Sequence, residues 1–159
     1  MSDDARFEDG REAPLNLGAE DADDLKVISS LVQDAVFPIT EMSWLARERR
    51  FAILLNRFRW EDRDAAQQRG RAVERVQSLL VIDSVLGVAS QGVDRRDSDT
   101  ILSLMSLSFE PEDEVGGAIV LTLAGDGALR LRVEAIEATL KDVTRPYVAP
   151  SKQIPDHSD

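Results

Sequence analysis

The chain of 159 residues is long enough for one domain, carries a net charge of −11 and contains no cysteine. The lack of cysteine excludes disulfides, thiolate nucleophiles and cysteine-ligated zinc, and the acidic balance argues against a nucleic-acid-binding protein. No signal segment opens the chain, and no apolar run reaches the roughly 18 residues of a membrane span. We therefore expect a cytoplasmic protein without membrane contact.

Both ends of the chain are expected to be disordered tails. Residues 1–20 are acidic, residues 148–159 are mostly polar, and neither segment has an apolar period. Such segments bury too little apolar surface to offset the chain entropy that ordering would cost. The sequence therefore predicts a single globular domain over residues 21–147.

The first predicted element is a helix over Asp23–Gln33. Leu25, Ile28 and Leu31 recur at spacings of three and four, which is typical of a helix with one buried face. Asp21 stands just before the helix, where a side chain that caps the first turn is expected.

A period of two replaces the helical period after Ala35 and predicts strands. The predicted strands cover Val36–Ile39, Met42–Leu45, Arg50–Trp60, Val73–Ile82, Ser84–Gly92, Thr100–Phe109, Ala118–Leu123 and Ala128–Val133. The first two are separate short strands or one bent strand, so the total is about seven. Apolar residues on both faces of Arg50–Trp60 predict a central strand that is covered on both sides. Gly125-Asp126-Gly127 predicts a hairpin turn between the last two strands.

Two further segments are not predicted as strands. One lies between two strands and the other follows the last strand. Glu61–Ala72 is rich in charged residues, so we expect a mobile loop there, with a helical turn near Ala65–Gln68. Glu134–Val143 predicts a closing helix, because apolar residues fall at helical spacing at Ile136, Leu140 and Val143.

These elements predict an α+β domain. About seven antiparallel strands form a curved sheet or a small barrel, with one N-terminal and one C-terminal helix packed on it. The strands have no helices between them, so parallel crossovers are not expected. The order of the elements resembles the pleckstrin-homology-like superfold.

Three groups of residues carry a second resemblance. They are Asp24-Leu25, Val27-Ile28-Ser29 and Gln33-Asp34-Ala35 in the first group, Arg49-Arg50-Phe51, Leu54-Leu55-Asn56-Arg57-Phe58 and Trp60-Glu61 in the second, and Leu129-Arg130-Leu131, Val133-Glu134 and Ile136-Glu137 in the third. Together they resemble an uncharacterised bacterial family that is known only as a domain of unknown function. The resemblance spans about Leu17 to Tyr147 and implies one intact domain, without assigning an activity or functional residues.

No arrangement of catalytic or metal-binding residues is recognised in the sequence. His157, the only histidine, lies in the C-terminal tail, which argues against a catalytic triad or a histidine metal site. Glu134 and Glu137 are expected to stabilise the first turn of the closing helix, and the acids of Pro111–Gly117 to form a solvated turn. Gly125-Asp126-Gly127 lacks the third glycine of a dinucleotide-binding loop. We therefore expect no catalytic residues, no metal and no cofactor.

An arginine-rich stretch is the strongest candidate for a binding site. Arg47–Arg75 holds nine arginines and five acids, a local charge of +4. Arginine offers a planar fork for phosphate or carboxylate groups. The candidate ligand-binding residues are Arg47, Arg49, Arg50, Arg57, Arg59 and Trp60. The alternative is a solvated surface in which the arginines pair with nearby acids such as Glu48, Glu61, Asp62 and Asp64.

The sequence favours a non-catalytic binding or scaffold module that contacts a protein partner. Such a partner would bind a sheet edge, a groove beside the last helix or the arginine-rich loop. The alternative is a binding domain or enzyme for a small phosphorylated or carboxylated ligand held by the arginine-rich stretch. RNA contact through this stretch is a weaker third reading, and a homodimer through the sheet edge is compatible with the pattern.

Overall fold

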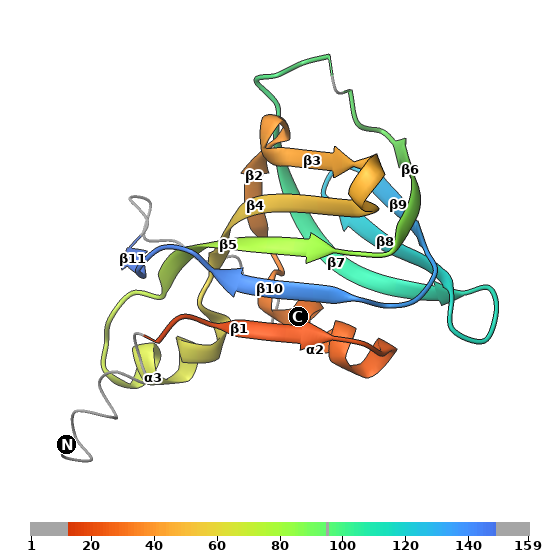
Figure 1. Cartoon of the computed structure of the whole chain (residues 1–159). Coiled ribbons are helices and arrows are strands. Elements are labelled where there is room, and N and C mark those ends of the chain that lie inside the picture. Colours follow the sequence, from red (N-terminus) through yellow and green to blue (C-terminus); the bar gives the residue numbers. More distant parts are fainter. Residues whose placement is uncertain (1–12, 95, 149–159) are drawn as a thin grey trace.

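The computed structural model describes residues 13–94 and 96–148, so residues 1–12 and 149–159 of the expected tails, with His157, lie outside the described residues. One antiparallel sheet of eleven strands dominates, with two short α-helices (Figure 1). The helices and strands are β1 (Asn16–Ala19), α2 (Ala22–Leu31), β2 (Ala35–Pro38), β3 (Met42–Leu45), β4 (Arg50–Phe58), α3 (Arg63–Gln68), β5 (Glu74–Ile82), β6 (Val85–Gln91), β7 (Ile101–Pro111), β8 (Gly117–Leu123), β9 (Ala128–Val133), β10 (Ala138–Asp142) and β11 (Tyr147–Val148). Three single 3-10 turns, η1 (Ile39–Glu41), η2 (Ala46–Glu48) and η3 (Trp60–Asp62), connect them.

The sheet is strongly curved but does not close into a barrel. Its strand order is β1-β10-β5-β4-β2-β7-β8-β9-β6, with β3 paired to β4 and β11 paired to β5. The strands β1, β10, β5 and β4 form one layer and β7, β8 and β9 a second layer behind it (Figure 1). The apolar core lies between the two layers. Antiparallel pairing is confirmed, and the sheet has more strands than the predicted seven.

The predicted first helix is confirmed as α2. Asp21 caps it by accepting a hydrogen bond from the Asp24 backbone N–H at 2.8 Å, and Leu25 and Ile28 are buried. The helix packs against β1 and β7 and fills the opening between them. It is not the first element, because Asn16–Ala19, within the expected N-terminal tail, pairs with β10 as β1.

The predicted closing helix over Glu134–Val143 is wrong, because this segment contains the strand β10. Its residues alternate between buried and exposed, and β10 pairs with both β5 and β1. Pairing with β5 satisfies backbone groups that a helix here would leave unpaired. The C-terminal helix, on which the resemblance to the pleckstrin-homology-like superfold depended, is therefore absent from the described residues.

The central strand and the hairpin turn are confirmed. β4 pairs with β5 on one side and with β2 and β3 on the other. Its inner face is buried, whereas Ala52 and Leu54 on the outer face are half-buried, and no helix lies over the strand in Figure 1. The cover is therefore complete on the inner face and partial on the outer face. At the hairpin turn, Gly125 and Asp126 have φ of 80° and 67°, and the Leu123 N–H donates to the Gly127 carbonyl at 2.8 Å.

The segment expected to be a mobile loop contains η3 and α3, which includes the predicted helical turn. Neither α2 nor α3 is long and apolar enough to span a membrane, and no other helix in the described part of the chain is.

Candidate functional site

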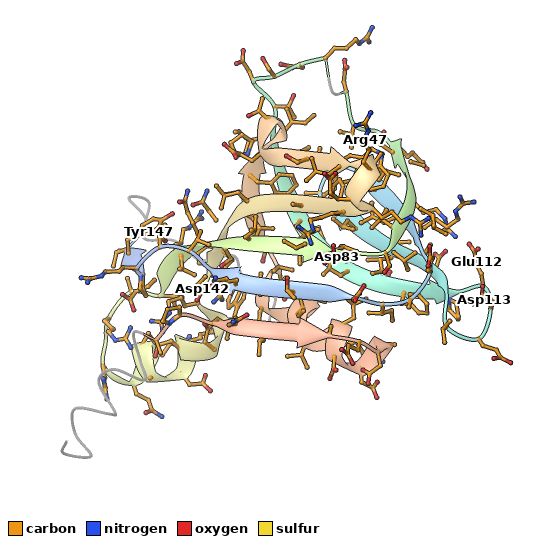
Figure 2. The ribbon with its side chains drawn as sticks, in the orientation of Figure 1. Arg47, Asp83, Glu112, Asp113, Asp142 and Tyr147 are labelled. Atoms are coloured by element: carbon orange, nitrogen blue, oxygen red, sulfur yellow. The ribbon has the colours of Figure 1, made fainter. Side chains whose placement is uncertain are left out.

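The six candidate ligand-binding residues do not converge on one site. Arg47, Arg49 and Arg50 precede or begin β4, whereas Arg57 and Arg59 lie at its far end. Arg50 and Arg57 are seven positions apart along the extended strand, which is roughly 23 Å at about 3.3 Å per residue. Figure 2 shows Arg47 near one end of the layer and Asp142, which contacts Arg57, near the other.

Arg57 is completely buried and all its donors are used. Its Nε donates to Ser78 Oγ at 2.9 Å, and the two terminal nitrogens donate to Glu61 and Asp142 at 2.8 to 3.0 Å and to the Phe58 carbonyl at 3.1 Å. An incoming anion would find no free donor on this side chain. Arg57 is therefore the cation of a buried structural ion-pair network and is not accessible to an anionic ligand.

The ion pairs and hydrogen bonds around Arg57 connect five parts of the fold, namely β4, η3, β5, β10 and the segment ahead of β1. Asp142 lies on β10, and it also accepts hydrogen bonds from Ser78 Oγ on β5 at 2.6 Å and from the Leu15 N–H ahead of β1 at 2.9 Å. Burial lowers the pKa of Arg57, but the hydrogen bonds and charges of Glu61 and Asp142 outweigh it, and the pKa lies above its ordinary value. The ordinary pKa of arginine is already high, so this upward shift favours the charged form of Arg57.

Arg59 and Trp60 are also engaged within the protein. Arg59 is buried and donates to Glu74 at 2.8 Å and to Asp62 at 3.5 Å, and Arg71 reaches the same two carboxylates. The Trp60 ring N–H donates to the Gln33 carbonyl at 2.9 Å. At this end of β4, the expected pairing with Glu61 and Asp62 is found, but the solvated surface of that alternative is not, because Arg57 and Arg59 are buried.

At the other end of β4, Arg49 and Arg50 close one corner of the curved sheet. Arg49 has a left-handed φ of 53°, and its carbonyl accepts a hydrogen bond from the Val85 N–H at 2.9 Å. Its guanidinium pairs with Glu134, and Arg50 pairs with Asp83 at 2.8 Å, which raises the pKa of Arg50. This corner joins the start of β4 to the start of β6. The expected place of Glu134 in the first turn of a helix is wrong, because Glu134 lies between β9 and β10, where no helix forms.

Beyond the corner, β3 and β6 leave a seam between the two ends of the curved sheet. β3 pairs only with β4, and β6 pairs only with β9, so each strand has a second edge without a partner strand in the described residues. Both strands lie at the upper side of the view in Figure 1, opposite α2. We call this region, Met42–Leu45 with Val85–Gln91, the β3–β6 seam.

A pocket of about 140 Å³ opens in the β3–β6 seam. It is lined by Ile39, Thr40, Met42, Trp44, Phe51, Val88, Ser90 and Leu129. Ile39, Phe51 and Leu129 are buried and form the floor, with 6%, 3% and 2% of their surface exposed. Met42, Trp44 and Val88 are half-buried, and the two hydroxyl residues are exposed. The pocket is therefore an apolar hollow with polar groups only at its mouth.

The side chains that line this pocket are apolar or carry a hydroxyl. None of its eight lining residues is ionisable, so the pocket itself supplies no general acid or base.

The expected solvated acidic turn is found elsewhere, between β7 and β8, where Arg130 pairs with Glu110 and Glu112; Figure 2 shows Glu112 and Asp113 there. In the described ranges, no group of acids and histidines is placed to hold a metal ion.

Sequence reasoning missed the pocket because its walls come from distant parts of the chain. A local signal existed in β3 and β6, where Met42 and Trp44, and Val88 and Ser90, alternate with outward residues. A break in the pairing register between Val85 and Gly87 turns both Val85 and Val88 inward, and this bulge is not readable from the alternation.

Comparison with curated proteins and with solved structures found no significant match. The model of one protein family matches residues 15–157, which is most of the chain and includes every residue of the β3–β6 seam. The matched stretch also includes the buried arginine network and both layers of the sheet. The chain therefore belongs to the family described as protein of unknown function DUF2948.

Proposed function

We propose that this protein is a non-catalytic binding module that takes up an extended segment of a partner protein in the β3–β6 seam. The observation that carries the proposal is the pair of strand edges that flank one apolar pocket. An open edge offers backbone N–H and carbonyl groups to an incoming strand, and a pocket beside it selects one side chain. The cysteine-free composition supports a cytoplasmic setting for this binding.

The composition of the two strands supports the same proposal. Proteins usually protect open strand edges with charged residues or proline. Met42–Leu45 and Val85–Gln91 contain neither, and Leu45 and Leu86 expose 44% and 40% of their surface. β1, the strand at the far end of the sheet order, lies instead against α2.

The alternative of a small anionic ligand receives less support. It requires several arginine forks around one ligand, and the candidate arginines lie at two ends of β4. Arg57 and Arg59 are buried against carboxylates. No second function is therefore proposed.

The test uses the whole chain and a library of random peptides. Peptides selected for binding are expected to slow amide hydrogen exchange in Met42–Leu45 and Val85–Gln91, but not in β1. Ser90→Lys should weaken binding by about tenfold or more, because it places a charge at the pocket mouth, whereas Ala89→Lys on the neighbouring outward position should not.

Three results would contradict the proposal. They are the selection of no peptide, protection that avoids both strands, and equal weakening by the two lysine variants. Protection that depends only on the concentration of the protein itself would identify the occupant as a second copy of this chain, which also contradicts a separate partner.

A further inference from the structure

The pocket in the β3–β6 seam has the size of one six-membered ring. Its volume is about 140 Å³. A cavity of about 150 Å³ lined by leucine, isoleucine and phenylalanine holds one benzene molecule. The pocket therefore accommodates a single ring and not an extended apolar surface.

The lining excludes a charged occupant. A buried charge requires a partner of opposite charge, and no ionisable side chain lines the pocket. The only polar side-chain groups are the hydroxyls of Thr40 and Ser90, which are exposed at the mouth. The occupant is therefore neutral, with an apolar body and at most a polar tip that reaches these hydroxyls.

The walls favour an aromatic ring over an aliphatic group. Trp44 and Phe51 present two aromatic rings, and ring pairs contribute more than their buried area alone. Met42 adds a thioether, which makes favourable contacts with aromatic edges. Buried aromatic residues are also common as anchors of protein–protein interfaces.

We propose that the pocket binds the ring of one phenylalanine or tyrosine from the segment that lies along the β3–β6 seam. This inference rests on the proposed function and adds to it the residue class that the seam selects. The aromatic anchor fills the pocket while the neighbouring residues of the segment pair with β3 or β6.

The test uses toluene and 4-methylphenol, which reproduce the two side chains, and benzoate as a charged comparison. A Trp60→Phe variant leaves Trp44 as the only tryptophan, so fluorescence reports on the pocket wall. Both neutral rings should change the fluorescence in a saturable manner, and benzoate should bind at least about tenfold more weakly.

Pocket-filling variants provide the control. Ser90→Phe and Thr40→Phe, from opposite sides of the mouth, should each abolish the saturable change, whereas Ala89→Phe on the outer face should keep it. Thermal melting checks that each variant is folded. Binding of toluene that persists in both filled variants, or binding of benzoate as tight as that of toluene, would overturn the inference.

The two proposals can fail separately. If peptides protect β3 and β6 but show no need for an aromatic residue, and toluene does not bind, the aromatic anchor is refuted and the binding module stands. If toluene binds in the pocket but no peptide engages the strands, the preference of the pocket for a neutral ring stands, whereas the proposed function and the role of the ring as an anchor both fail.

Discussion

At the scale of single residues, the candidate arginines differ in burial. Arg57 and Arg59 are buried, whereas Arg47, Arg49 and Arg50 are exposed. Arg57 follows Phe51, Ile53 and Leu55 at a period of two, so it occupies a core position at the end of a buried stripe. A charge there is tolerated because Asp142 and Glu61 surround it. The alternation marks this position as inward, but nothing in the local sequence identifies Asp142, 85 residues further on, as the partner.

Removal of Arg57 should be strongly destabilising. Arg57→Ala leaves Asp142 buried without its cation, and loss of one member of a buried pair costs about 3–5 kcal/mol of unfolding free energy. Urea unfolding followed by circular dichroism measures this change. The exposed Arg47→Ala is the control and should change the unfolding free energy by less than about 0.5 kcal/mol. Equal losses in the two variants would refute the role of the network.

Replacement of both Arg57 and Asp142 by apolar residues should lower the unfolding free energy less than removal of Arg57 alone. In Arg57→Met with Asp142→Leu, two apolar groups of similar size replace the fully buried pair, and the only carboxylate that loses its cation is Glu61, whose side chain is 30% exposed and reaches water. The double variant should therefore unfold at a higher urea concentration than Arg57→Ala. A midpoint at or below that of Arg57→Ala would contradict this account.

At the scale of elements, most strands and the helix α2 could be predicted because their apolar residues recur at a regular period of two or of three to four. β10 could not, since Ile136, Leu140 and Val143 fit a helix while Ala138, Leu140 and Asp142 fit a strand. The choice depends on the β5 edge beside it, which lies 60 residues away in the sequence. β1 was missed because Asn16–Ala19 contains only one large apolar residue, Leu17, and so shows no alternation.

Two alanine substitutions distinguish the strand from the predicted helix. Leu140→Ala should cost about 2–5 kcal/mol, because Leu140 is completely buried. Val143→Ala should cost less than about 1 kcal/mol, because Val143 exposes 49% of its surface. Chemical denaturation measures both, and similar losses at the two positions would favour the helix instead.

The hairpin of β7 and β8 depends on a close backbone approach at Gly117. A Cβ atom there would lie 2.2 Å from the Glu110 carbonyl oxygen and 2.9 Å from Pro111 Cα. Gly117→Ala should therefore lower the unfolding free energy by about 1–3 kcal/mol. Gly18→Ala is the matched control, since its nearest neighbour would be 3.9 Å away, and its melting temperature should not fall. A stable Gly117→Ala variant would show that the two strands can separate at little cost.

At the scale of the whole molecule, the curved sheet has two openings that are treated differently. α2 fills one with Leu25 and Ile28, whereas the β3–β6 seam leaves a hollow in the other. Sequence patterning could predict the helix and the two strands but not the seam, because curvature and the bulge in β6 determine how far apart the strands lie. The prediction of one arginine site was wrong for a related reason. The charge pattern along the chain does not show which side chains point into the core.

The two openings should differ in their contribution to stability. Ile28→Ala, at the filled opening, should cost about 2–5 kcal/mol, because it leaves a cavity among buried residues. Val88→Ala, at the seam, removes a half-buried side chain beside an existing hollow and should cost less than about 1.5 kcal/mol. Denaturant unfolding of both variants measures the difference. Equal costs would mean that the seam is packed as tightly as the helix side.

The pairing of β1 with β10 joins residues more than 100 positions apart, and the contact between Leu15 and Asp142 spans 127 positions. During translation, β1 is therefore synthesised long before its partner strand β10. The two strands can pair only after almost the entire domain has been translated. Non-local contacts of this kind slow folding, and an unpaired strand is prone to aggregation in the meantime. We expect the layer of β1, β10, β5 and β4 to form only after Asp142 has left the exit tunnel of the ribosome. The yield of soluble protein should therefore depend on the chaperones available at that stage.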